Sequence, residues 1–99
     1  MYSVSAQLYG EAVRAFRASV EGEKYYSAVL RFTHAGVSCC MRLSAMLFYT
    51  EVVRPEGKRR VVSDLTPVWW EFHTSIDGVE ELNDFTLADF ADLLRSTAH

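Results

Sequence analysis

The sequence lacks most of the features that mark an exported or membrane protein. Its 99 residues contain only two cysteines, Cys39 and Cys40, and these are adjacent. Neighbouring strand residues point to opposite faces of a sheet, so a bond between the two is sterically poor and no disulfide framework exists. The first twenty residues have neither the basic start nor the apolar run of a signal peptide, and no apolar stretch reaches membrane-spanning length. We therefore expect a soluble, cytoplasmic protein.

Motifs for bound groups are missing as well. Neither the phosphate-loop nor the dinucleotide-binding glycine spacing occurs. His34, His73, His99 and the two cysteines do not form the paired ligand motifs of a metal site. We expect no cofactor and no metal. With 49% hydrophobic and 23% charged residues, the composition is that of an ordinary globular protein, and the length suits one domain spanning residues 1–99.

The N-terminal segment has the spacing of an amphipathic helix. Apolar side chains recur there every three or four residues, which places them on one stripe. The stripe consists of Tyr2, Ala6, Tyr9, Val13, Phe16 and Val20. Gly10 weakens this helix, and the first eight residues also alternate as a strand does, so an extended start is the alternative.

The C-terminal segment gives a clearer helix signal. Thr86 is a suitable N-cap, with Asp89 placed to bond back to the cap and Phe85 placed to pack on Phe90. The predicted buried stripe is Leu87, Phe90, Ala91 and Leu94.

Three strands are expected between the two helices, joined by turns at Ala35-Gly36 and at 55–58. A two-residue first turn pairs His34 with Val37, and a four-residue second turn pairs Arg54 with Arg59. A three-residue first loop with a glycine bulge is the alternative, and it would shift the first strand. The expected fold is α+β, with a three-stranded antiparallel β-meander in the order α-β-β-β-α.

These two registers separate apolar from polar side chains, which supports them because a one-residue slip would mix the two sets. The apolar face is expected to contain Tyr26, Ala28, Leu30, Phe32, Val37, Cys39, Met41, Leu43, Ala45, Leu47, Val68, Trp70, Phe72 and Ile76. The opposite face is mainly polar, with Glu71 directly across from Arg42.

The adjacent tryptophans Trp69 and Trp70 fall on opposite faces of this sheet, with Trp70 in the core. Trp69 joins an apolar corner on the polar face, and large exposed apolar patches on small proteins often mark partner sites. The other members of this corner are Tyr25, Met46, Phe48, Leu65 and Pro67. Either a helix of the same chain covers it or a partner does. The preferred hypothesis is a non-catalytic interaction module that self-associates as a homodimer or higher oligomer.

A cysteine-dependent enzyme is one alternative. The registers bring Arg31, Cys40 and His73 into one row across three strands, with Cβ atoms of neighbours about 4.5 to 5.5 Å apart. An imidazole and a guanidinium can stabilise a thiolate nucleophile. The sequence shows no oxyanion-stabilising group and no cysteine-hydrolase signature around Cys40, so we expect this row to be incidental.

A nucleic-acid-contacting protein is the other alternative. A basic β-ribbon can contact phosphates, and the second hairpin tip carries Arg54, Lys58, Arg59 and Arg60. The order α-β-β-β-α resembles that of double-stranded RNA-binding domains in topology only. Residues 71–99 carry one Lys/Arg against seven Asp/Glu, so phosphate would be repelled where those domains are basic. The basic tip and acidic C-terminal third could instead meet between subunits.

Overall fold

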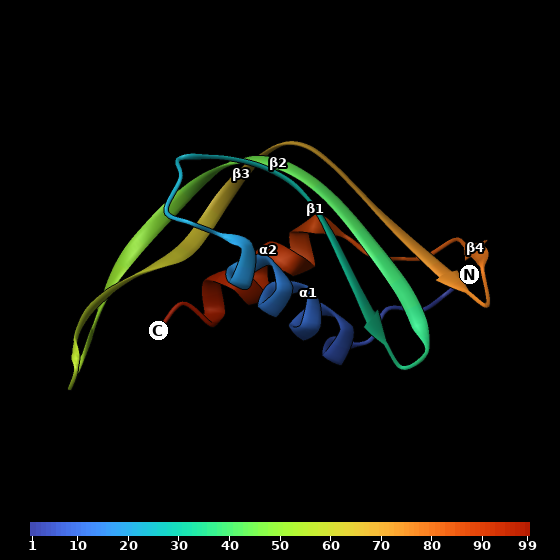
Figure 1. Ribbon diagram of the computed structural model, residues 1–99, viewed down its shortest axis with the longest axis horizontal. Helices are drawn as coiled ribbons and strands as arrows, with labels where there is room; N and C mark the ends of the chain where they lie inside the picture. Colours follow the sequence, from blue (N-terminus) through green and yellow to red (C-terminus); the bar gives the residue numbers. More distant parts are fainter.

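The computed structural model describes residues 1–99 and has the expected α+β architecture with one additional strand. An antiparallel sheet in the order β1-β2-β3-β4 arches over the two helices, which both lie on its concave side (Figure 1). The elements are α1 (Ala6–Ser19), β1 (Tyr25–His34), β2 (Val37–Arg54), β3 (Gly57–Ile76), β4 (Val79–Glu81) and α2 (Leu87–Ser96).

Helix α1 begins later than the periodicity predicts. Ser5 is its N-cap, and the Ser5 hydroxyl accepts a hydrogen bond from the Leu8 amide at 3.2 Å. Tyr2 lies outside the helix and forms an isolated parallel bridge with Asn83. The extended alternative is therefore correct before Ser5, where a hydroxyl cap stops the helix from growing further toward the N-terminus. The helix buries Leu8, Ala12, Val13 and Phe16 against the sheet.

Helix α2 has the predicted cap and the predicted buried stripe. The Thr86 hydroxyl accepts from the Asp89 amide at 3.2 Å, and Leu87, Phe90, Ala91 and Leu94 are its buried residues. The Asp89 carboxylate does not bond back to the cap. The Thr86 amide instead donates to the Tyr9 hydroxyl at 2.9 Å, so α1 supplies the second half of the cap.

The register of the first hairpin is as predicted. His34 pairs with Val37 across a two-residue turn, and Leu30 pairs with Met41. Both turn residues have positive φ, 50° at Ala35 and 78° at Gly36, as two-residue turns that follow the strand twist require.

The register of the second hairpin is partly wrong. Leu43 pairs with Trp70 as predicted, but Arg54 pairs with Gly57 rather than Arg59, across the two-residue turn 55–56. Register shifts between Ser44/Ala45 and Phe48/Tyr49 account for the difference, since each adds one unpaired residue to β3. The loop is therefore shorter than predicted because the extra residues are placed in bulges.

Strand β4 is absent from the predicted meander. Its three residues pair with Thr74, Ser75 and Ile76 after a turn at Asp77-Gly78. Both turn residues have positive φ, so this short hairpin uses the same turn chemistry as the first. Three residues are too few to show the alternation of apolar and polar side chains that marks a strand, so the sequence contains no signal for β4.

The core fills the space between the concave side of the sheet and the helices, and it is a cluster of 19 buried residues. Phe85 belongs to this cluster and stacks on Phe72 with ring centroids 3.9 Å apart. Trp70 faces this side as predicted, 5.9 Å from Phe85, but remains 37% exposed at the rim. Val68 and Ile76, assigned by the sequence to the core, are also exposed. Val68 is the residue left unpaired at the first bulge, so its side chain does not follow the alternation.

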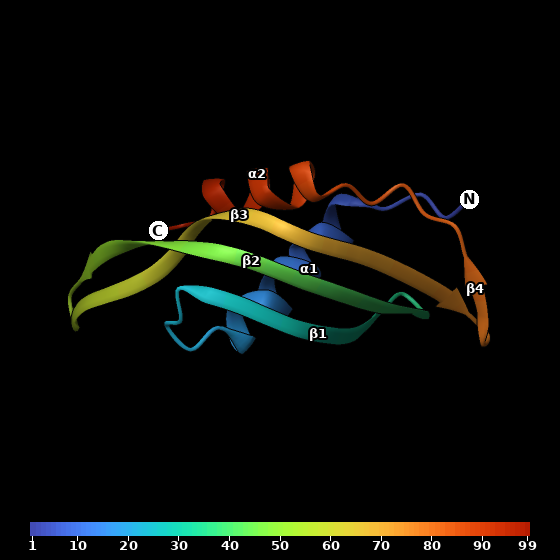
Figure 2. The same cartoon turned by 90° about the horizontal axis from the view of Figure 1, so that it is seen from above.

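The second hairpin extends beyond the rest of the sheet as a two-stranded arm (Figure 2). Its strands outrun β1, which ends its pairing at Tyr25 opposite Met46. The molecule measures 45 × 27 × 19 Å, with the arm at one end of the long axis and β4 at the other. Neither helix has the length and apolar character needed to cross a bilayer.

Candidate functional site

The convex face of the sheet is not covered by either helix. Figures 1 and 2 show both helices on the opposite, concave side, and Trp69 on the convex face is 51% exposed. Neither helix of the chain therefore covers Trp69. Both helices lie on the concave side and leave the convex face uncovered.

Four large side chains of the predicted corner lie together on this face, and we call them the outer apolar patch. Tyr25 pairs with Met46, and Trp69 pairs with Ser44 two residues along the same strand. Tyr25, Phe48 and Trp69 are each more than half exposed, and Met46 is 40% exposed. Strand alternation brings them to one face, since 44, 46 and 48 point the same way. Val29, on the same side of β1, is a further exposed apolar residue that the sequence analysis missed.

Leu65 and Pro67 do not belong to this patch. Leu65 is buried in the core and pairs with Leu47, and Pro67 pairs with the buried Ala45. The bulge between Ser44 and Ala45 reverses the alternation of β3 on the arm side, which moves both residues to the helix-covered face. The patch is thus smaller than the sequence predicts, and three of its four members are aromatic.

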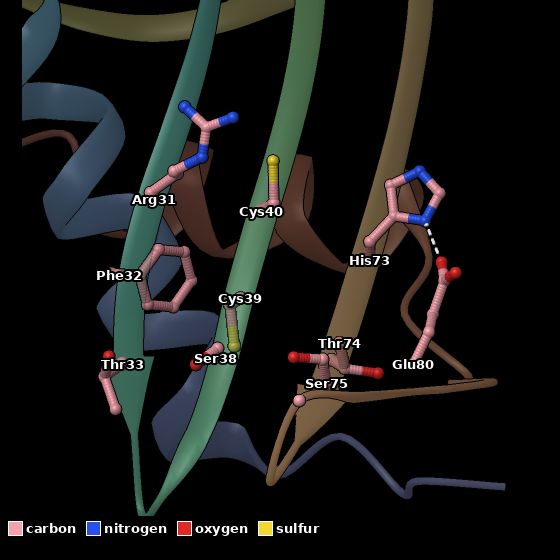
Figure 3. Close-up of a pocket in the computed structure, with 11 residues that line it drawn as sticks. Arg31, Phe32, Thr33, Ser38, Cys39, Cys40, His73, Thr74, Ser75 and Glu80 are labelled. Carbon is pink, nitrogen blue, oxygen red and sulfur yellow. Dashed lines mark hydrogen bonds and ion pairs between the residues drawn. The ribbon is translucent and has the colours of Figure 1, made fainter.

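The row of Arg31, Cys40 and His73 forms as the registers predict. Arg31 pairs with Cys40, and Cys40 pairs with His73. A cavity of about 520 Å³ lies over this end of the sheet and is lined by all three. Figure 3 shows the three side chains on adjacent strands, with the imidazole turned toward Glu80.

The hydrogen bonds of His73 do not include Cys40. Its Nδ1 lies 2.6 Å from the Glu80 carboxylate and its Nε2 lies 3.1 Å from Glu71. Hydrogen bonds to Glu71 and Glu80 raise the pKa of His73. Both ring nitrogens therefore face carboxylates, and neither is placed to accept a proton from the Cys40 thiol. The row therefore has the residues of a cysteine dyad without its hydrogen bond.

The other thiol, that of Cys39, lies on the opposite face of β2, which the helices cover. Cys39 is buried, and burial raises its pKa to about 11. Because the thiolate is the reactive form, this cysteine is expected to be inert at neutral pH. Nowhere in the structure do three or more His, Cys, Asp or Glu side chains form a group that could hold a metal ion.

The four basic residues of the hairpin tip are not one free phosphate-binding surface. Arg54 donates to the His99 carbonyl at 2.8 Å, and Lys58 pairs with Glu51 at 3.4 Å. The Arg60 guanidinium lies over the Tyr49 ring, 4.5 Å from its centroid. Two of the four charges are therefore already engaged with oxygen atoms of the same chain.

Arg59 and Arg60 line a different site that the sequence analysis did not identify. Together with Arg17 of α1, they are among the residues that line a cavity of about 330 Å³. Arg17 could not be predicted at this cavity, because its position in a helix does not indicate which strand the helix will pack against. Glu80 was not predicted beside His73 either, since the three residues of β4 gave no strand pattern.

Comparisons with known proteins identify no relative: no protein family model, no curated protein and no solved structure matches this chain.

Proposed function

We propose that this protein is a non-catalytic interaction module that self-associates through the outer apolar patch. The observation that carries this proposal is the open convex face, where Trp69, Phe48, Tyr25 and Met46 are exposed on adjacent strands while both helices lie on the other side. Aromatic and Met side chains are enriched in the desolvated centres of protein interfaces. Burying these four would remove a large apolar area from water.

A second copy is the preferred partner because the arm beside the patch has an unpaired edge. On the edge of β2 that faces β1, the last pairing is the hydrogen bond from the Leu47 amide to the Lys24 carbonyl, at 2.8 Å. From Leu47 to the hairpin tip, no strand of the chain pairs with this edge. Open strand edges recruit other strands, and a two-stranded ribbon is marginal on its own. A two-fold dimer places the same patch and the same arm on both subunits, so each arm can cover the other subunit's patch.

A contact function fits the polar end of the convex face better than catalysis does, since His73 is held by two carboxylates and Cys40 makes no hydrogen bond to it. We further propose a cytoplasmic location for the module. A reducing compartment would keep the half-exposed Cys40 as a free thiol when two copies meet face to face.

The test is the mass of the protein in solution. Sedimentation equilibrium at tens of micromolar should give twice the chain mass of 11.3 kDa for the wild type. The double variant Trp69→Ser, Phe48→Ser should sediment as a monomer with an unchanged circular dichroism spectrum, since neither side chain is in the core.

Leu82→Ser is the matched control, because Leu82 is 81% exposed and lies outside the patch. It should leave the mass at that of a dimer. A wild-type chain that remains monomeric at these concentrations would overturn the proposal.

A further inference from the structure

The outer edge of β3, on the side away from β2, is unpaired over most of its length. Strand β4 pairs with this edge only at 74–76, so no strand of the chain pairs with it from 57 to 73. The Asn83 side-chain amide donates to the Phe72 carbonyl at 3.1 Å, so this carbonyl points away from β2. Main-chain groups of alternate strand residues point to the same edge. The amide and carbonyl of Trp70 therefore also point outward, where no strand of the chain is present.

Helix α2 lies below this edge and extends past it. Figure 1 places α2 on the concave side, and in Figure 2 it lies beyond β3 on the side away from β2. Between the two elements is a cavity of about 510 Å³, which we call the edge groove. Its walls include Pro67 and Trp70 of β3 and Ala88 and Ala91 of α2. A strand added to β3 would lie about 4.8 Å farther out, so its concave-facing side chains would enter this groove.

The edge groove is apolar and only partly filled. All residues from 66 to 70 are exposed, although they form one continuous strand segment. Trp70 is 37% exposed at the rim, and the small side chains of Ala88 and Ala91 line the groove from the other side. Open strand edges beside side-chain pockets bind extended peptides, because main-chain pairing supplies affinity and the pockets select side chains. The groove therefore suits an extended polypeptide with apolar side chains at alternate positions.

The segments that form the edge groove are acidic. Residues 64–70 and 84–95 contain four carboxylates and one guanidinium, those of Asp64, Asp84, Asp89, Asp92 and Arg95. Arg95 is paired with Asp64 and Asp92, so its charge is not free for a ligand. Asp84 accepts from the Val4 amide, and Asp89, in the first turn of α2, makes no ion pair. Carboxylates therefore lie toward both ends of the groove, where they favour a cationic partner.

We propose that the outer edge of β3 binds an extended segment of another protein as an added strand, and that this segment carries apolar residues flanked by Lys or Arg. Its main chain would pair with the outward amide and carbonyl of Trp70. Alternate apolar side chains would enter the edge groove, and the flanking cations would lie near the carboxylates toward its two ends. The outer apolar patch is on the other side of the sheet, so this site is independent of the proposed self-association.

The probe is the peptide acetyl-Lys-Lys-Val-Thr-Val-Lys-Lys-amide, titrated into the full chain while backbone amide chemical shifts are followed. Saturable shifts should appear at 65–72 and 86–91, in the segments that form the groove. Replacing the peptide's lysines with glutamates should weaken binding about tenfold, because the groove is acidic. Replacing its valines with serines should weaken binding about tenfold as well, because the apolar groove is then left unfilled.

Methylation of the peptide's backbone nitrogens tests main-chain pairing without changing a side chain. Alternate amides of an added strand point toward β3, and the others point to solvent. Methylating one alternate set should therefore abolish the saturable shifts, whereas methylating the other set should leave the affinity within about threefold. A peptide held by its side chains alone would respond alike to both modifications.

Ala88 is the position in the protein that tests the edge groove itself. Ala88→Lys should weaken binding of the unmodified peptide about tenfold, because it fills the groove and adds a like charge. Ala88 is an exposed helix residue, so the variant should fold. Ser96→Lys is the matched control, because it adds the same charge at the end of α2 on a residue that does not line the groove. It should leave the affinity within about twofold, because surface charges act weakly at this distance in salt.

Three results would each overturn the proposal: no saturable shifts up to about 1 mM peptide, equal losses of affinity in the two lysine variants, or equal affinities of the two methylated peptides. Shifts at 65–72 that follow the protein concentration, with no response to the peptide, would also overturn it. In that case the edge of β3 pairs with a second copy of the chain.

Discussion

His73 is a candidate catalytic base by its strand position, but in the structure its imidazole is bound by two carboxylates instead of by the Cys40 thiol. The register correctly places it beside Cys40, but Glu71 and Glu80 occupy both of its ring nitrogens. Glu71 could be predicted as a neighbour from its strand position. Glu80 could not, because it depends on a strand of three residues. The sequence therefore predicted that Arg31, Cys40 and His73 lie in one row, but not that two carboxylates bind the imidazole.

The protonation of His73 should make stability depend on pH. Hydrogen bonds to Glu71 and Glu80 raise its folded-state pKa above the ordinary 6.5. The stabilisation is therefore complete below pH 6.5 and is lost as the pH rises through the raised, folded-state pKa. An NMR titration of the imidazole should show the raised pKa, and Glu80→Gln should move it back toward 6.5. Glu56→Gln, at the distant hairpin tip, should leave it unchanged, and a wild-type pKa at or below 6.5 would contradict the assignment.

At the scale of elements, the two short hairpins offer a direct comparison of turn chemistry. Ala35 and Asp77 both precede a glycine and both have positive φ, near 50°. Asp and Asn tolerate this conformation, whereas an alanine in it is strained. Ala35→Asn should therefore raise the free energy of unfolding by about 0.5 to 1 kcal/mol.

Urea unfolding measures that change, and Asp77→Asn is its control because the wild-type residue already suits the turn. Asp77→Asn should change stability by less than about 0.5 kcal/mol. A destabilised Ala35→Asn would show that the alanine side chain makes a contact that outweighs the strain.

Phe85 makes more ring contacts than any other aromatic residue of the chain. It precedes the cap of α2, and its ring contacts Phe72 and Trp70 of β3, Tyr9 of α1 and Phe90 of α2. Phe85→Ala should lower the free energy of unfolding by about 3 to 5 kcal/mol, because it leaves a cavity where sheet and helices meet. Phe85→Leu should cost less than half of this in the same urea titration. Equal losses in the two variants would mean that the ring stacking, rather than the filled volume, is what matters.

The sequence predicted the strands better than it predicted their irregularities. Alternation and turn residues gave the first hairpin and the centre of the second correctly, including Leu43 opposite Trp70. The bulges that move Leu65 and Pro67 to the concave side leave no comparable signal, since each depends on how a curved sheet fits its helices. The membership of the outer apolar patch could therefore be predicted only in part.

For the whole molecule, the sequence predicted a sheet with two helices but not which side they would cover. Both helices bury their stripes against the concave side, because the apolar face is there, and a single layer of helix leaves the convex face open. Trp69 is thus exposed because the fold has a helical layer on one side of the sheet only. A 99-residue chain has too few elements to cover both faces of a long sheet.

The charge distribution along the long axis gives a prediction for the proposed association. The basic hairpin tip lies at one end, and the acidic Asp77, Glu80 and Glu81 lie at the β4 end (Figure 1). In a two-fold dimer with antiparallel long axes, each tip approaches the partner's acidic end, so charge should steer the encounter while apolar burial sets the dissociation rate. Raising the salt concentration should slow association about tenfold and raise the dissociation constant by the same factor, while the dissociation rate, which apolar burial controls, changes much less. Concentration-jump kinetics, followed by light scattering, measure both rates.

Charge reversal separates steering from general salt effects. Lys58→Glu, at the tip, should slow association at low salt and lose most of the salt dependence. Arg14→Glu makes the same charge change on α1, where Arg14 is paired with Glu11 on the concave side and away from both ends of the axis. It should leave the association rate near that of the wild type. If salt instead dissociates the dimer while the association rate stays constant, ion pairs rather than Trp69 and its apolar neighbours hold the two copies together.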